Sequence, residues 1–182
     1  MGTHISKSGS DEMAKGSRGG KVGTNTIVTY SDEELKQAVL DWSIDGFTKI
    51  RQDEQNGVYN RSAEILEDYI SNKSENEPLF RGVVIPFDEA EMKVGDVIDQ
   101  KGTSSWTKSS ISAEAFANTM VRDGIATIFV LDEGTKKGAN ISDLKGTGRR
   151  RESEILVSRK SKQKIEKIEW ENGKLFVYIS EI

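Results

Sequence analysis

The sequence predicts an α+β fold, in which N-terminal helices cover a mixed, mostly antiparallel β-sheet core. Helix-like patterns occupy residues 31–75, whereas β-prone runs dominate residues 78–182. The clearest strand is the apolar run 125–131, and Asn172-Gly173 separates two further strands, 164–170 and 174–180. An Asn-Gly pair between two such runs is typical of a type I′ hairpin turn.

Composition narrows the classes of function. The chain has 182 residues, a net charge of −4, no cysteine and one histidine, His4. The net charge argues against a wholly basic nucleic-acid binder. The lack of cysteine excludes thiolate metal sites and cysteine nucleophiles. The sequence has no long apolar run and no signal-peptide core, so we expect no membrane partner and action in a cytosol. We also expect that the protein binds no metal and is a monomer.

The chain divides into a leader and one domain. Residues 1–25 are rich in Gly, Ser and Lys and predict a disordered leader, followed by a single domain over 26–182. Residues 26–30 form a short β-prone run. Ser31 and Glu34 make a capping box that opens a helix.

Two helices are expected in the N-terminal third. The first has an apolar stripe that is interrupted at 44–46, and a polar connector follows at 52–60. A second helix is predicted over 62–71, ending in a polar loop at 71–78. We interpret both as a structural cover for the sheet. The apolar positions of the two helices are Leu35, Val39, Trp42, Phe47, Ile50, Ile65, Leu66, Tyr69 and Ile70.

Arg81 stands inside the apolar strand predicted over 79–85. A buried arginine needs an anionic partner, because an unpaired buried charge is costly. That partner is either an internal carboxylate or the phosphate of a ligand, which suits the planar guanidinium. Gly82, next along the chain, would let a ligand approach the backbone closely.

Hydroxyl side chains surround Trp106 in the segment 97–108. The segment is either a Ser/Thr-rich edge with a core tryptophan, or the source of a hydroxyl that orients a catalytic carboxylate. A short helix is expected over 112–121, with Ala113, Phe116 and Ala117 on one face. After the strand at 125–131, residues 139–148 are polar and predict a flexible segment.

Glu152 and Glu154 begin the last strand before the hairpin. Side chains two apart share a face of a strand, so both acids and Leu156 should point one way, and Ile155 and Val157 the other. Paired carboxylates suit chemistry at an anomeric carbon, where one stabilises an oxocarbenium-like centre and the other handles a proton. The alternative is a solvated strand start that happens to carry two acids.

Taken in order, Arg81, Ser105-Trp106-Thr107 and Glu152-Ser153-Glu154 resemble the motifs of the arginine–serine–glutamate class of mono-ADP-ribosyltransferases, which includes bacterial toxins and phage enzymes. The resemblance covers about residues 78 to 182. The Trp-Thr pair departs from the commoner Thr-Ser, so Ser104 remains a rival to Ser105 as the motif serine.

The resemblance implies that NAD is the substrate and that its nicotinamide–ribose bond is cleaved. It implies that Glu154 is the catalytic acid residue, that Ser105 positions it, and that Glu152 engages a protein acceptor, with glutamate there favouring arginine. It also implies that Arg81 clamps the phosphates. Gly82 and Phe116 match positions that face nicotinamide, although helical spacing equally allows Phe116 to pack in the core.

Two other functions remain open. The same fold could act as an NAD glycohydrolase, with water as the acceptor. A non-enzymatic nucleic-acid or virion-interaction module is also compatible with the cationic segments 136–137, 149–151 and 159–162. We favour the interpretation of these cations as solvated surface, although the run 149–151 lies beside the expected acceptor site.

Overall fold

The computed structural model describes residues 28–132, 134, 136–144 and 153–182. Four α-helices lie in this part of the chain: α1 (Asp32–Asp41), α2 (Phe47–Gln55), α3 (Arg61–Ser71) and α4 (Ser110–Ala117). The strands are β1 (Leu79–Pro86), β2 (Val97–Asp99), β3 (Ser104–Trp106), β4 (Gly124–Leu131), β5 (Gly138–Asn140), β6 (Ile155–Val157), β7 (Lys162–Glu171) and β8 (Lys174–Glu181).

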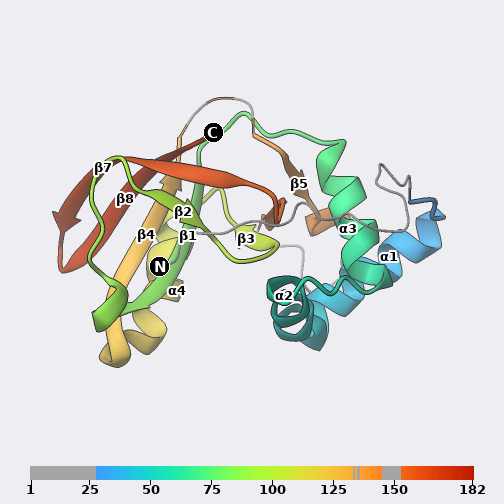
Figure 1. The fold of residues 1–182 in the computed structure, drawn as a ribbon, viewed down its shortest axis with the longest axis horizontal. Helices are drawn as coiled ribbons and strands as arrows, with labels where there is room; N and C mark the ends of the chain where they lie inside the picture. The colour runs from blue at the N-terminus through green and yellow to red at the C-terminus, as the bar shows by residue number, and fades with distance from the viewer. Residues whose placement is uncertain (1–27, 133, 135, 145–152) are drawn as a thin grey trace.

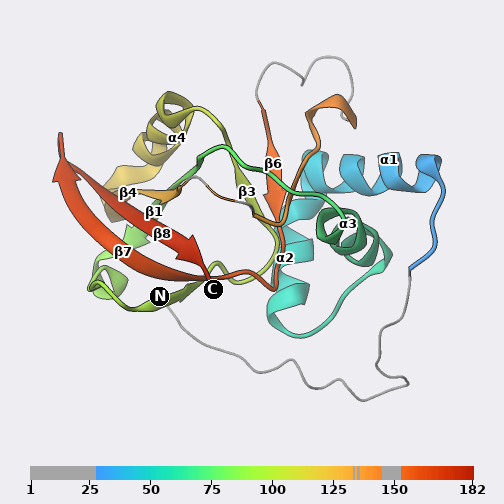
Figure 2. The same cartoon turned by 90° about the horizontal axis from the view of Figure 1, so that it is seen from above.

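The strands form two sheets (Figure 1). The larger has the order β1-β4-β8-β7-β2, and the smaller has the order β3-β6-β5. Only the β4–β8 pair is parallel among the described strands, and the other pairs are antiparallel. The predicted α+β class with a mixed, mostly antiparallel sheet is therefore confirmed. Figure 2 shows β3 and β6 between the larger sheet and helices α1–α3.

The N-terminal helices follow their local signals closely. Ser31 Oγ accepts the N–H of Glu34, and the Glu34 carboxylate accepts the N–H of Ser31, as the capping box predicts. The expected interruption at 44–46 is instead a π-helical turn, Trp42–Gly46, that joins α1 to α2 without a break. Helix α2 also runs on to Gln55, so the predicted connector over 52–60 begins only after that residue.

Three apolar clusters fill the molecule, and β6 separates two of them. Leu156 packs into the cluster formed by α1, α2 and α3. Ile155 and Val157 pack into the cluster on the face of the larger sheet that is turned toward β3 and β6. This is the alternation predicted for the strand. The third cluster lies on the other face of the larger sheet, where Ala113 and Ala117 of α4 cover Ala126, Ile128 and Val130 of β4.

Helix α4 lies so close to β1 that only glycine fits at position 82. A Cβ atom on Gly82 would lie 1.9 Å from the carbonyl oxygen of Ala113. The open backbone of Gly82 therefore serves this helix packing on one face of the strand.

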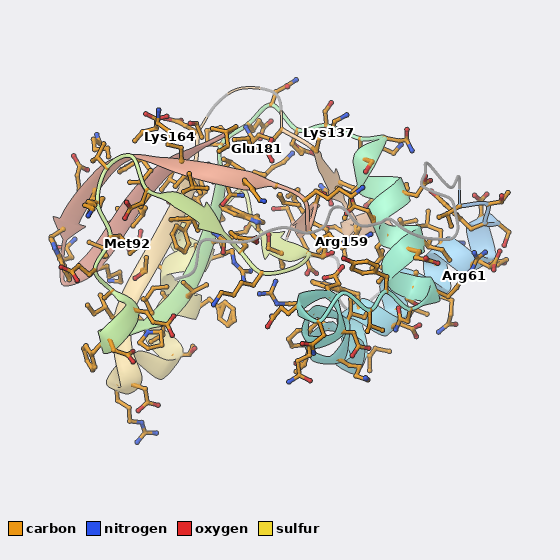
Figure 3. The ribbon with its side chains drawn as sticks, viewed as in Figure 1. Arg61, Met92, Lys137, Arg159, Lys164 and Glu181 are labelled. Carbon is orange, nitrogen blue, oxygen red and sulfur yellow. The ribbon has the colours of Figure 1, made fainter. Side chains whose placement is uncertain are left out.

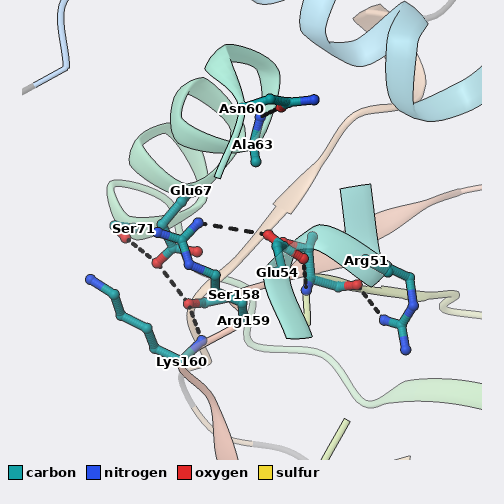
Figure 4. A network of polar contacts seen from close by, with 10 residues as sticks. Arg51, Glu54, Asn60, Ala63, Glu67, Ser71, Ser158, Arg159 and Lys160 are labelled. Atoms are coloured by element: carbon teal, nitrogen blue, oxygen red, sulfur yellow. Dashed lines mark hydrogen bonds and ion pairs between the residues drawn. The ribbon is translucent and has the colours of Figure 1, made fainter. Parts of the chain in front are cut away.

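A polar network joins the helical layer to the turn between β6 and β7 (Figure 4). The buried Glu54 carboxylate accepts bonds from the N–H and the hydroxyl of Thr103, at 2.8 and 2.7 Å, and lies 3.7 Å from the Arg159 guanidinium. Glu67 of α3 accepts a bond from Ser158 Oγ at 2.8 Å. In Figure 3, Arg159 lies at the junction of helices and sheet, whereas Arg61 lies at the outer end of the helices.

Several expectations need correction. The segment predicted to be flexible over 139–148 contains part of β5 and a 3-10 turn, Ser142–Leu144, because β6 supplies β5 with backbone partners. Residues 28–30 are not a strand, and Val28 and Tyr30 pack against the helical cluster instead. The leader 1–25 and residues 145–148 lie outside the described residues.

The hairpin between β7 and β8 is confirmed. Asn172 and Gly173 both have positive φ, 53° and 78°, as a type I′ turn requires.

We expect Glu54→Ala to destabilise the protein by about 3–5 kcal/mol, because it leaves the buried N–H of Thr103 without an acceptor and the Arg159 charge without its carboxylate. Urea denaturation measures the loss. The matched control is Asp53→Ala, one residue earlier, whose carboxylate pairs with the exposed Lys49 side chain four residues before it in the same helix and should contribute less than about 1 kcal/mol. Equal losses for the two variants would contradict the assigned role of Glu54.

Candidate functional site

Glu154 lies where the two sheets and the helical layer meet. Its Oε2 atom accepts a bond from Ser105 Oγ at 2.7 Å and a second from the indole Nε1 of Trp42 at 3.0 Å. The backbone around it is also held, since the Glu154 N–H donates to Ser142 Oγ and the Glu154 carbonyl accepts the N–H of Ile141. Three separate segments thus hold Glu154, two of them through its carboxylate and the third through its backbone.

The pairing of β3 with β6 explains why Ser105, and not Ser104, reaches this carboxylate. Ser105 lies opposite Leu156, and Trp106 lies opposite Ile155. Ser105 and Leu156 therefore share the helical side, whereas Ser104 and Trp106 face the larger sheet. There, Ser104 Oγ accepts the indole N–H of Trp106 at 2.8 Å.

Arg81 lies next to this pair. Its Nη1 donates to the carbonyl oxygen of Ser105 at 3.0 Å, and its Nε donates to Gln100 Oε1 at 3.1 Å. Both acceptors are neutral, and within the described residues no ion pair joins Arg81 to a carboxylate. Burial, and secondarily the positive charge of Arg51, lowers the pKa of Arg81 to about 9. Arg81 is thus a cation at neutral pH held by neutral oxygens.

Arg51 holds the loop that precedes β3. It donates to the carbonyl of Thr103 and, at 2.8 Å, to that of Gln100. Burial lowers the pKa of Arg51, and the charge of Glu54 opposes that shift. The loop needs such support because Lys101 and Gly102 have φ of 63° and 118°.

The two remaining candidates for ligand binding, Gly82 and Phe116, lie on different elements, β1 and α4. The N–H and C=O of Phe80 pair with Thr107 on the outer edge of β1, so those of Gly82, two residues on, point to the same edge. Phe116 is 65% exposed on α4, so of its two predicted roles core packing is wrong. Ala113 and Ala117 form the buried face of that helix.

Glu152 and the arginine run 149–151 lie outside the described residues. Glu154 itself precedes β6, and the strand proper is shorter than predicted, Ile155–Val157.

Sequence reasoning missed two residues of the site. Trp42 was assigned to the apolar stripe of a covering helix, although its indole reaches Glu154 from 112 positions away in the chain. Gln100 bridges Arg81 and Gln163 with its side-chain amide. The interrupted helical pattern at 44–46 was the one local signal near Trp42, because π-turns are frequent at functional sites.

The cationic segments are not simple solvated surface, which corrects that expectation for two of their residues. Lys136 is buried, and its Nζ donates to the carbonyls of Asp132 and Gly134. Arg159 stacks over the ring of Tyr59 at 3.9 Å, beside Glu54. These two charges stabilise loops and layers of the fold.

Membrane spans and metal clusters are both missing from the described residues. No helix among them has the length and apolarity to cross a membrane. No three acidic or histidine side chains in this part of the chain cluster closely enough to bind a metal ion.

Comparison with solved structures identifies the fold. The Vis toxin, an ADP-ribosyltransferase from Vibrio splendidus, matches with a TM-score of 0.60 and 19% identity, over 84% of this chain and 74% of that one. A second ADP-ribosyltransferase, from Clostridium botulinum, matches with a TM-score of 0.61 and 15% identity, over 82% of this chain and 86% of that one. The enzymatic component of the C2 toxin from the same species matches with a TM-score of 0.63 and 20% identity, over 82% of this chain and 43% of that one.

This chain has the fold of the bacterial mono-ADP-ribosyltransferase toxins. No protein-family model and no curated protein sequence matches it. The resemblance seen in the sequence is therefore confirmed at the level of fold, from structure alone.

The two adjacent serines should differ in what they contribute to stability. Ser104→Ala leaves the buried indole N–H of Trp106 without an acceptor and should cost about 1–3 kcal/mol. Ser105→Ala removes a partly exposed bond that water can replace, and should cost less than about 1 kcal/mol. Urea denaturation of both variants tests the difference, and the reverse order of losses would contradict the strand orientation.

Proposed function

We propose that this chain is an NAD-dependent mono-ADP-ribosyltransferase that transfers ADP-ribose to a protein acceptor, with arginine as the acceptor residue. One observation carries the proposal: Ser105 donates to Glu154 while Arg81 donates to the carbonyl of that same Ser105. A carboxylate, a hydroxyl and a cation thus converge within a fold shared with ADP-ribosyltransferases.

Glu154 is the proposed catalytic residue. As the bond between the ribose and nicotinamide breaks, its electron pair leaves with the nicotinamide nitrogen, and positive charge builds on the ribose. A fixed carboxylate stabilises that charge without first having to reorient. The acceptor nitrogen then bonds to the anomeric carbon and loses a proton, and Glu152 is proposed to engage that acceptor. Ser105 positions Glu154.

Arg81 is the proposed partner of the NAD pyrophosphate. Burial, and secondarily the charge of Arg51, lowers the pKa of its guanidinium to about 9, and its two bonds go to neutral oxygens and not to a carboxylate. A phosphate oxygen would supply a negative charge, and a guanidinium binds phosphate with two parallel bonds. The side chain therefore fits an anionic ligand beside Ser105.

Gly82 and Phe116 are proposed to bind the nicotinamide end. The polar backbone groups of Gly82 point to the outer edge of β1, where they can pair with an amide. The exposed ring of Phe116 is accessible to a planar ligand.

The acceptor is proposed from Glu152 and from two structural neighbours. Vis has been crystallised with agmatine, a compound that carries a guanidinium group, as arginine does. Exoenzyme S from Pseudomonas aeruginosa has been crystallised with human 14-3-3 protein beta and carba-NAD. Both observations concern those proteins, and they favour a protein acceptor and an NAD substrate here. The burial of Lys136 and the pairing of Arg159 speak against the nucleic-acid module.

The first test is NAD cleavage. Wild-type protein incubated with labelled NAD should release nicotinamide, and Glu154→Gln should lower the rate by roughly 10²–10³-fold, because the charge at the reacting centre is lost. Glu169→Gln, in an exposed pair with Lys167, is the matched control and should keep the wild-type rate. Full activity of Glu154→Gln would refute the assignment.

A second test separates transfer from hydrolysis. With a protein acceptor present, Glu152→Gln should abolish ADP-ribosylation while part of the nicotinamide release survives, since only the acceptor-engaging group is changed. Labelled protein and free ADP-ribose are quantified in the same reaction. If the wild type yields only free ADP-ribose with every acceptor mixture, the protein is an NAD glycohydrolase instead.

A further inference from the structure

We propose that Trp42 is a positioning residue for Glu154, and that the π-turn in the N-terminal helices exists to deliver its indole N–H to that carboxylate. The catalytic part of this inference rests on the proposed function. The hydrogen bond and its consequences for Glu154 are independent of it.

The contact is directional and comes from a buried indole. Trp42 is 3% exposed, and its Nε1 lies 3.0 Å from Glu154 Oε2. An indole N–H can only donate, so the oxygen must accept. Since the same Oε2 also accepts the Ser105 hydroxyl at 2.7 Å, two donors from opposite layers act on one atom. This fixes the torsion of the carboxylate, and hence the direction of its second oxygen.

The backbone around Trp42 is shaped for this contact. The π-turn Trp42–Gly46 widens the helix at the point where the indole leaves it. A Cβ on Gly46 would lie 2.3 Å from the carbonyl oxygen of Asp41, so the turn depends on glycine at this position. Phe47, directly after the turn, packs against the indole with ring centroids 6.2 Å apart, which limits rotation of the ring.

Charged side chains hold the segment that carries Ser105. Arg81 binds the carbonyl of Ser105, and Arg51 binds the carbonyl of Thr103. Glu54, which is of opposite charge, is itself engaged by Thr103 and Arg159. The indole N–H of Trp42 donates to the Glu154 carboxylate itself, and such a donor favours the ionised form over the protonated one.

The chain offers a direct probe, because its three tryptophans, Trp42, Trp106 and Trp170, give three indole N–H resonances. In the ¹⁵N-labelled full chain, the Trp42 signal should shift when an acid titration protonates the Glu154 carboxylate that the indole binds. The Trp106 indole binds a neutral hydroxyl and Trp170 is largely exposed, so both serve as internal controls. Glu154→Gln should remove the Trp42 inflection. A flat Trp42 signal, or an inflection that survives in Glu154→Gln, overturns the contact.

Kinetics then test the positioning role. Trp42→Phe keeps an aromatic ring but removes the donor, and should lower kcat for NAD cleavage roughly tenfold to a hundredfold, with KM changed less than about twofold. The acid limb of the rate profile should move to higher pH, because the carboxylate form has lost a donor. Trp106→Phe, which loses an equally buried indole N–H, should leave that limb in place.

Unchanged kcat and acid limb in Trp42→Phe overturn the role, even where the resonance data confirm the bond. Absence of NAD cleavage by the wild type would refute the proposed function instead, and the resonance titration would still decide whether Trp42 holds Glu154.

Discussion

The burial of β6 on both faces is the constraint on which the site depends. Its three side chains are all buried, with Leu156 in the helical cluster and Ile155 and Val157 in the sheet cluster. Because side chains alternate along a strand, this apolar pattern forces Glu154 to face the helices. A slip of one residue would place the carboxylate in the apolar sheet core, at a cost that no contact there would offset. The core therefore fixes the direction of the functional side chain.

The same alternation acts on the neighbouring strands. On β3, the bond between Trp106 and Ser104 occupies the sheet side, which leaves Ser105 on the side of Glu154. On β1, Gly82 accommodates α4 on one face while Arg81 occupies the other. Each site residue thus lies next to a residue that anchors the strand. The site and the core are interleaved along three short strands, so packing supplies the orientation that chemistry needs.

Much of this arrangement could be predicted from local sequence, and the rest could not. The capping box at Ser31, the strand β4 and the Asn172-Gly173 turn are encoded within a few residues, and the structure confirms them. Strand β5 was missed because its pairing with β6 gives it its conformation, whereas its own residues, Gly138–Asn140, have no β-prone pattern. The hydrogen bond from Trp42 joins residues that are 112 positions apart. A tryptophan in an apolar stripe does not indicate by its own local sequence which residue its indole will bind. Local patterns also placed Lys136 at the surface, although carbonyl groups of its own loop hold it inside.

The helical layer is more than a cover for the sheets, because it reaches the site through polar contacts. Trp42 binds Glu154, Arg51 holds the loop before β3, and Glu54 receives the N–H of Thr103 on the same segment. Buried polar contacts of this kind contribute little net stability when satisfied, but they are costly to break and they fix one arrangement of the layers. A helical layer attached only by apolar packing could slide by a fraction of a turn at small cost. One attached through these donors cannot slide without detaching the loop and the carboxylate together, so the position of Glu154 is tied to the integrity of helices far from it in the sequence.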